Sequence, residues 1–203
     1  MEERFLDKVY TMGDVSTEAL YSEWAKTYDT EVSAAGYASP GRAAEALAGV
    51  VEDRTVPLLD MGCGTGLSGL AFATAGFTTI DGVDLTQEML DVAARHNLYR
   101  DLIKTDVADP LPFVPGTHTH VAAVGLFSPS HAPAETIGIV LDYLQPGGCF
   151  VFSLNDHAMA DPSYEGTVMN WVDSGAAAVL FREYGEHLPT EELKSTIYVL
   201  RRR

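Results

Sequence analysis

Three glycines, Gly62, Gly64 and Gly66, alternate with other residues directly after Asp60, which ends a short apolar run. Glycine tolerates a positive φ and lets a ligand touch the backbone. A turn of this composition can therefore support a nucleoside. The same spacing could also form a tight turn that binds nothing.

Two further aspartates stand where predicted strands end. Asp84 lies about 20 residues after the turn, and its carboxylate could accept both hydroxyls of a ribose. Asp106 ends the next predicted strand and could accept from an adenine amino group, with the amide of Val107 facing the ring. An aspartate in such a position can also be a helix cap or a turn residue. The glycine turn that precedes Asp84 favours nucleoside binding.

Histidine and amide side chains follow two later predicted strands. His131 comes just beyond the fourth strand, and Asn155, Asp156 and His157 follow the fifth. Ligands of open parallel sheets bind beyond the carboxyl ends of the strands, so these residues are candidates for proton transfer. We take His131 and Asn155 as the candidate catalytic residues. Each of the four could instead be a loop residue or a helix cap.

The elements that must position these side chains form an alternating series. Apolar segments predict five strands, at 58–60, 78–84, 102–106, 121–127 and 149–154. Helices are predicted between them, at 70–75, from an N-cap at Thr86 onward, and across 137–144. Repeated strand–helix units imply a parallel sheet with helices on both faces. Two last strands, 177–184 and 195–200, have a link too short for a crossover helix and should pair antiparallel.

Charge and composition restrict the partners. The chain has 203 residues and a formal net charge of −16, which repels phosphate backbones and argues against nucleic acid. The basic run 201–203 is expected to be a solvated tail. No secretory leader or membrane span is evident, so we expect a cytoplasmic protein without a membrane partner. Cys63 and Cys149 have no metal-ligand spacing, and we predict small buried thiols and no metal.

The ordered set of motifs resembles the class I S-adenosylmethionine-dependent methyltransferases over roughly residues 55–155. It comprises the glycine turn, Asp84, the pair Asp106-Val107, and Pro146-Gly147-Gly148 before the fifth strand. The resemblance implies a Rossmann-like α/β fold whose seven-stranded, mostly parallel sheet has an antiparallel last strand and helices on both faces. It also implies S-adenosylmethionine as cofactor and S-adenosylhomocysteine as product.

The resemblance assigns a part of the cofactor to each segment. The glycine turn, with Asp60 before it and Leu67 after it, would face the methionine and ribose. Asp84 would hold the ribose hydroxyls, and the adenine would lie among Leu85, Met89, Asp106 and Val107. The floor below the sulfonium would consist of Gly125, Leu126 and Phe127. The chain departs from the family pattern at 118–120, where His-Thr-His stands in place of an aspartate.

The segment before the sheet is similar to the lead-in of small-molecule methyltransferases, among them the group named for the Williams-Beuren region. The similarity lies in the run Trp24 to Tyr28-Asp29, and it implies that Trp24 and Tyr28 close over the cofactor. Helical spacing offers another explanation, one packed face of a single helix. The stretch from Gly36 to Gly41, which contains Pro40, is predicted to separate two helices in this region.

A single domain, 1–203, is therefore predicted in three parts. These are a helical lid at 1–54, a cofactor-binding core at 55–155, and an acceptor-side segment with the antiparallel strands at 156–203. Tyr164, Met169 and Trp171 in the last part could form an apolar acceptor wall or pack in the core. The motifs specify neither the acceptor nor an oligomeric state.

The predicted activity is in-line methyl transfer to a small molecule, and three alternative activities differ from it in the motifs they require. A catalytically silent S-adenosylmethionine-binding subunit would carry the same motifs. A nicotinamide-dependent oxidoreductase would place its third glycine one residue later, where this chain has Leu67. A nucleic-acid methyltransferase would end its fourth strand in an Asn or Asp, Pro, Pro, aromatic tetrad, but this chain has Phe-Ser-Pro-Ser at 127–130.

Overall fold

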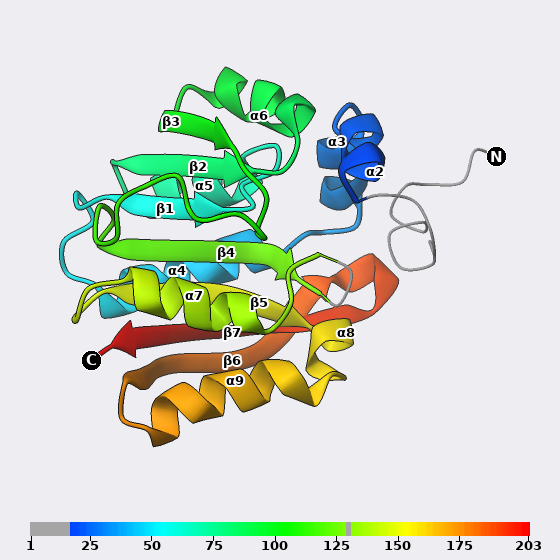
Figure 1. Cartoon of the computed structure of the whole chain (residues 1–203). Coiled ribbons are helices and arrows are strands. Elements are labelled where there is room, and N and C mark those ends of the chain that lie inside the picture. Colours follow the sequence, from blue (N-terminus) through cyan, green and yellow to red (C-terminus); the bar gives the residue numbers. More distant parts are fainter. Residues whose placement is uncertain (1–16, 129–130) are drawn as a thin grey trace.

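A sheet of seven strands crosses the protein in the order β3-β2-β1-β4-β5-β7-β6 (Figure 1). In the computed structural model, which describes residues 17–128 and 131–203, its five leading strands are parallel. The last strand, β7, runs antiparallel to both of its neighbours, β5 and β6. The predicted fold class is therefore confirmed. The strands are β1 Leu58–Met61, β2 Ile80–Asp84, β3 Tyr99–Lys104, β4 His120–Phe127, β5 Cys149–Asn155, β6 Ala177–Leu188 and β7 Leu193–Arg202.

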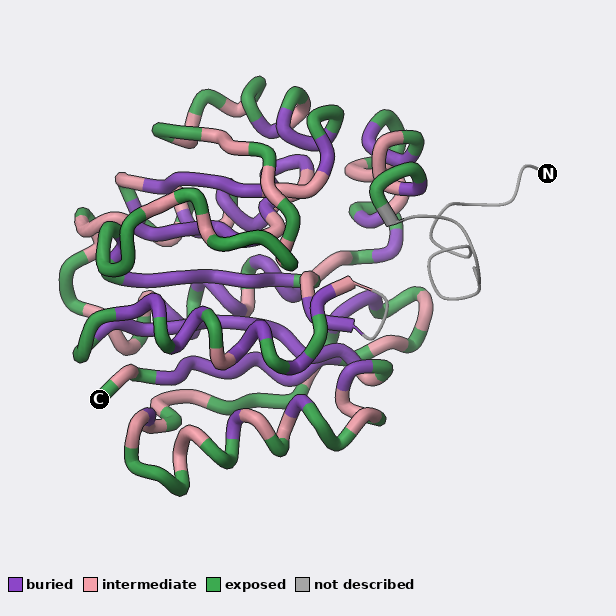
Figure 2. The backbone as a smooth tube through the Cα atoms, viewed as in Figure 1, coloured by how far each residue is buried: buried purple, intermediate pink, exposed green. Residues whose placement is uncertain are grey.

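Helices on both faces bury the central strands, which explains why β1 and β5 are nearly continuous apolar runs (Figure 2). Successive residues point to opposite faces, so Leu58 packs on one side of the sheet and Leu59 on the other. The first face is covered by α4 Ser39–Val50 and α5 Leu67–Thr74. The second is covered by α7 Glu135–Tyr143 and α9 Pro162–Asp173.

The remaining helices lie at the ends of the sheet. Figure 1 shows α2 Thr17–Trp24 and α3 Tyr28–Ala34 beside α6 Gln87–Ala93, on the side to which the parallel strands point. Three one-turn elements complete the described part, η1 Ala94–His96, α8 Asp156–Met159 and η2 Pro189–Glu191. In residues 17–128 and 131–203 there is no helix with the length and apolar character needed to cross a membrane.

Several predicted boundaries are wrong, each for a local reason. The predicted break at Gly36–Gly41 is only partly correct: α3 ends at Ala34 and α4 begins at Ser39, so Pro40 lies in the first turn of α4, where proline's missing N–H costs nothing. The strand β3 ends at Lys104, so Asp106 lies in the following turn. The predicted basic tail is paired, since Arg201 and Arg202 belong to β7. Trp24 ends α2 and Tyr28 begins α3, so they do not share the face of one helix.

The unusual His-Thr-His segment before β4 has a structural explanation. One ring nitrogen of His118 lies 2.7 Å from Asp81 and the other 2.6 Å from the hydroxyl of Tyr143, in the buried interior. Burial opposes ionisation of Asp81, but hydrogen bonds with Arg100 and His118 lower its pKa. The neighbouring His120 accepts from the amide of Cys149.

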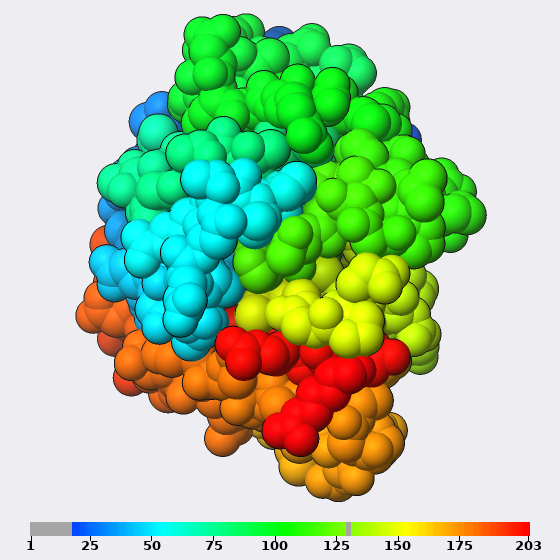
Figure 3. Space-filling model, turned by 90° about the vertical axis from the view of Figure 1, so that its left-hand side faces the viewer, coloured from blue at the N-terminus to red at the C-terminus, as the bar shows by residue number. Residues whose placement is uncertain are grey.

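This polar network joins the amino ends of the strands, at the edge of the sheet opposite the glycine turn. Figure 3 looks onto this edge, across which the C-terminal residues lie in red. The histidines that depart from the family pattern therefore hold the sheet together away from the predicted site. Both cysteines are buried free thiols, as predicted.

Candidate active site

A cavity of about 200 Å³ opens at the carboxyl ends of the parallel strands. Most residues assigned to the cofactor from the sequence line it, namely Tyr28, Gly62, Gly64, Asp84, Leu85, Met89, Asp106, Val107, Gly125 and Leu126. The candidate base His131 lines it too. Sequence reasoning did not single out Tyr21, Met61, Val83, Thr86, Thr105 and Val124, which complete the wall. Only the fold reveals them, because their residue types carry no chemical signal.

The glycine turn is open toward the cavity at one position. All three glycines have positive φ, 71° at Gly62, 53° at Gly64 and 95° at Gly66. A Cβ at Gly64 would meet no protein atom within 4 Å, so its backbone is accessible to a ligand. A Cβ at Gly62 would lie 2.8 Å from Leu126, and one at Gly66 would crowd His96. Gly66 thus serves packing against α6 and η1, and only the first two glycines line the cavity.

Asp84 is held in place by the turn that it faces. Its Oδ2 accepts from the amide of Gly64 at 2.9 Å, and its Oδ1 accepts from the amide of Thr86 at 3.0 Å. Thr86 occupies the predicted N-cap position of α6, but its hydroxyl donates to the same Oδ1 of Asp84 and makes no capping hydrogen bond to the helix. Burial raises the pKa of Asp84. The carboxylate is oriented by amides and retains lone pairs that can accept from a diol.

Asp60 lies beneath the turn and does not line the cavity. It is fully buried, and its Oδ2 accepts from the hydroxyls of Ser68 and Tyr99, each at 2.7 Å. Tyr99 can approach because Gly69 has no Cβ, which would collide with the phenol. Burial raises the pKa of Asp60 to about 6. Asp60 can therefore support the turn by its hydrogen bonds and act on a ligand only through it.

Asp106 fits both of its sequence-based interpretations, as a turn residue and as a residue that could accept from a ligand. The residue lines the cavity, and its Oδ1 also accepts from the amide of Ala108 at 2.9 Å, as in a turn. This hydrogen bond orients the carboxylate, whose other oxygen can accept from a ligand. Val107 and the buried side chain of Met89 also line this cavity.

Besides Asp60 and Gly66, three more residues predicted to contact the cofactor do not reach the first cavity. Phe127 packs in the core against Phe150, Phe152 and Tyr164, because its side chain leaves β4 on the face of the sheet that α7 and α9 cover. Leu67 lies on a small third cavity beneath the glycine turn. Trp24 lines a second cavity, described next.

A second, smaller cavity of about 40 Å³ adjoins the first and shares Tyr21, Tyr28, Gly125 and His131 with it. Its other lining residues are Trp24, Val32, Tyr37, Ser128, Asn155, His187 and Leu188. None of the described residues that line it carries a formal charge at neutral pH, since burial lowers the pKa of both histidines. The cavity is thus aromatic, with a few polar groups.

Both candidate catalytic residues face this second cavity. His131 places Nδ1 against the hydroxyl of Ser128. Asn155 is also the N-cap of α8, since its Oδ1 accepts from the amide of Ala158 at 3.0 Å. Asp156 instead accepts from Tyr184 and the amide of Lys194, and neither it nor His157 lines a cavity described here.

The predicted acceptor wall in α9 is absent from these cavities. Tyr164 is buried in the core, where its hydroxyl donates to the carbonyl of Ala132. Met169 is exposed, and Trp171 packs beneath Arg202. The second cavity is lined instead by residues that include Tyr37 and His187, which come from segments far apart in the sequence and which no local pattern identifies.

The N-terminal helices line both cavities and make polar contacts with α6 and with the glycine turn. Tyr21, Trp24 and Tyr28 form an aromatic cluster in which the rings of Trp24 and Tyr28 are 4.6 Å apart. Ser22 donates to Glu88 at 2.9 Å. Thr65, within the glycine turn, donates to Asp29 of α3. The aromatic cluster therefore lies directly over the turn.

Comparison with known proteins agrees with this geometry. Residues 58–148 match the family described as a methyltransferase domain. Human methyltransferase-like protein 27 is 34% identical over 131 residues, which are 63% of this chain and 53% of that protein. The 18S rRNA (guanine-N(7))-methyltransferase of Bos taurus is 43% identical over 77 residues, 38% of this chain and 27% of that protein. The chain thus spans about half the length of the first relative and less of the second.

A solved structure shows the same fold over almost the whole chain. In the complex of the Haloferax volcanii Trm112 methyltransferase activator with a methyltransferase, the matching chain superposes with a TM-score of 0.64. The match covers 92% of this chain and 99% of that chain at 17% sequence identity.

Asp60→Asn should change how stability depends on pH. The folded protein raises the pKa of Asp60 to about 6, whereas the unfolded chain has about 3.9. Ionisation therefore opposes folding, and the stability present below about pH 4 is lost as the pH rises to about 6. Over this interval, wild-type unfolding free energy should fall by about 2–3 kcal/mol relative to the variant, measured by urea denaturation. A constant difference would contradict a buried, proton-binding Asp60.

Asp84→Ala should weaken S-adenosylhomocysteine binding by about 1.5–3 kcal/mol, the usual contribution of hydrogen bonds to a charged group. Titration calorimetry measures the affinity, and circular dichroism checks the fold. Asp91→Ala is the matched control, because Asp91 is an exposed aspartate of α6 and lines none of the cavities described. Unchanged affinity in a folded Asp84→Ala protein would show that the ribose lies elsewhere.

Proposed function

Since the chain belongs to the class I S-adenosylmethionine-dependent methyltransferases, we propose that it methylates a small molecule held in the second cavity. The observation that carries this proposal is the pair of adjoining cavities that share Tyr28, Gly125 and His131. One has the groups that a nucleoside needs, and the other is lined mainly by aromatic side chains. A methyl group can pass between them only at the shared wall.

The residues of the first cavity fit the cofactor. Asp84 accepts from the ribose hydroxyls, the backbone at Gly62 and Gly64 lies against the methionine and ribose, and Asp106 with Val107 takes the adenine edge. S-adenosylmethionine supplies a methyl carbon that its positive sulfur activates. The protein's task is then alignment, and positioning can contribute on the order of 7–11 kcal/mol to the rate.

The acceptor proton can leave through His131. Burial lowers the pKa of His131, so its imidazole is neutral and able to take a proton at neutral pH. For this role Nδ1–H must donate to Ser128, so that Nε2 is the proton-accepting nitrogen of the neutral ring. With the cofactor bound, the accepting oxygen or nitrogen would give up its proton to Nε2 as it is methylated. General-base catalysis of this kind contributes about 10²- to 10⁴-fold.

An RNA acceptor is the second candidate, because three relatives are named as 18S rRNA (guanine-N(7))-methyltransferases. Two observations favour the small molecule. The net charge of −16 opposes the approach of a polyanion. The cavity next to the proposed cofactor site is lined by Tyr21, Trp24 and Tyr28, with no cationic side chain among the described residues that line it.

Incubation with S-adenosylmethionine labelled at the methyl group should place the label in a small molecule. The protein is given a metabolite extract in one reaction and purified ribosomal RNA in another, and products are analysed by mass spectrometry. His131→Gln should lower product formation by about 10²-fold or more. His157→Gln, at an exposed histidine outside the cavities, is the matched control and should have no effect. Label in RNA alone, or in neither reaction, would overturn the proposal.

Tyr28 should close over the bound cofactor. Hydrogen exchange across residues 20–40 should slow when S-adenosylhomocysteine is added, because a lid gains protection on closing. Tyr28→Phe should weaken binding by about 1 kcal/mol if its hydroxyl contacts the cofactor carboxylate, while Tyr184→Phe, on the exposed face of β6, should not. Equal exchange with and without ligand, or a Tyr28→Phe protein that is destabilised yet binds normally, would favour a purely structural Tyr28.

A further inference from the structure

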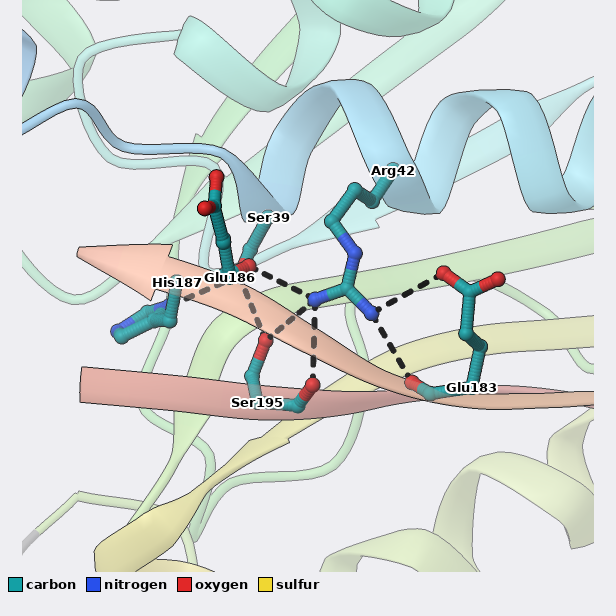
Figure 4. A network of polar contacts seen from close by, with 6 residues as sticks. All are labelled: Ser39, Arg42, Glu183, Glu186, His187 and Ser195. Atoms are coloured by element: carbon teal, nitrogen blue, oxygen red, sulfur yellow. Dashed lines mark hydrogen bonds and ion pairs between the residues drawn. The ribbon is translucent and has the colours of Figure 1, made fainter. Parts of the chain in front are cut away.

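A buried chain of hydrogen bonds leads from Arg42 to the wall of the second cavity (Figure 4). The guanidinium of Arg42 lies 3.2 Å from Oγ of Ser195, which lies 2.9 Å from Oγ of Ser39. Oγ of Ser39 lies 2.8 Å from Nδ1 of His187. This chain of hydrogen bonds joins α4 to β6 and β7, and it ends on the imidazole of His187, which lines the second cavity. The function proposed above makes no use of it.

Backbone carbonyl groups hold the side chain of Arg42 in place, so that it forms the fixed end of this chain of hydrogen bonds. Its guanidinium also donates to the carbonyl oxygens of Glu186, at 2.7 Å, and Glu183, at 3.0 Å. The strand leaves room for it at Gly185, where a Cβ would lie 2.8 Å from the guanidinium. The charged head thus has a single position against β6.

The chemistry of the donors sets the direction of the chain. A guanidinium only donates, so Ser195 must accept from Arg42. The hydroxyl proton of Ser195 then points to Ser39, and that of Ser39 points to Nδ1 of His187. In the reverse order the Ser195 hydroxyl would have no acceptor among the described residues, although this serine is fully buried. A buried donor without a partner costs about 1–3 kcal/mol, which favours the first order.

The direction determines where His187 carries its proton. Nδ1 accepts from Ser39, so the single proton of the neutral ring is on Nε2. Burial lowers the pKa of His187 to about 4; Asp156 opposes this shift, and Arg42 and His157 add to it. Nε2 makes no hydrogen bond within residues 17–128 and 131–203, and the ring lines the second cavity. The ring of Tyr37 meets it edge to face, with centroids 5.3 Å apart.

We propose that His187 is a specificity-determining residue that donates its Nε2–H to an oxygen of an uncharged, oxygen-bearing acceptor molecule. This inference rests on the proposed function and assigns a substrate class to the same site. The chain of hydrogen bonds from Arg42, called the relay below, leaves Nε2 of His187 a hydrogen-bond donor. The proposed base His131 must instead accept a proton. The two imidazoles would therefore bind different groups of the acceptor molecule. A carboxylate or ammonium group would find no counter-charge among the described lining residues.

The tautomer can be measured without knowing the acceptor. Protein labelled with ¹⁵N-histidine gives two-bond ¹H–¹⁵N correlations, in which His187→Gln identifies the signals of His187. We expect the Nε2–H form to persist from about pH 8 to about pH 5. Ser195→Ala, which interrupts the relay, should raise the Nδ1–H population, while Ser174→Ala on the exposed end of α9 should not. An Nδ1–H or charged ring in the wild type would overturn the proposal.

The substrate class is tested with labelled S-adenosylmethionine and one metabolite extract divided by ion exchange into neutral, anionic and cationic fractions. Label should enter the neutral fraction, and His187→Phe should lower product formation at limiting extract by about tenfold with cofactor affinity unchanged. Label only in a charged fraction, or an active His187→Phe protein, would overturn the role of His187 and leave the proposed function standing. Label in no fraction would count against the proposed function, and the tautomer would still decide the relay.

Discussion

The hydrogen bond from the Gly64 amide to the Asp84 carboxylate joins the two strand ends on which the site depends. At 2.9 Å it holds the turn after β1 against the end of β2, and so sets the cavity floor and the proposed ribose ligand together. The turn can adopt this shape because glycine accepts the positive φ values that bring its amide toward the carboxylate. Asp60 supports the turn from below through Ser68 and Tyr99. A cofactor would therefore meet a surface formed before it binds.

The proposed acceptor side is organised differently, by packing between segments distant in the sequence. The aromatic cluster of Tyr21, Trp24 and Tyr28 packs near Leu188, at the end of β6, and together they line the second cavity. Its volume of about 40 Å³ is small beside the 200 Å³ of the first. We therefore expect an acceptor larger than a few water molecules to displace α2 and α3, which contact α6 and β3 through exposed polar pairs and Leu188 through apolar packing.

Two histidine clusters illustrate how the same residue type serves different purposes at opposite ends of the sheet. His118 is saturated by Asp81 and Tyr143, so its ring fastens the amino edge and has no nitrogen left for a ligand. His187 has only its Nδ1 occupied, by Ser39, and its ring lines a cavity. Burial lowers the pKa of both, but only the second has geometry suited to recognition. Hydrogen-bond saturation, more than burial, separates the structural histidine from the candidate functional one.

The sequence by itself determined the fold class and the cofactor half of the site, because these depend on local chemistry. Gly62, Gly64 and Asp84 belong to one strand–turn–helix–strand unit, so spacing along the chain predicts their meeting. Trp24, Phe127 and Tyr164 were harder, since periodicity shows that a side chain is apolar but not whether it faces a cavity or the core. His187 and Ser195 carried no local signal at all. Only the antiparallel pairing of β6 with β7 and the packing of α4 against them brought Arg42, Ser39 and His187 together, because such contacts arise from tertiary packing between segments about 150 residues apart.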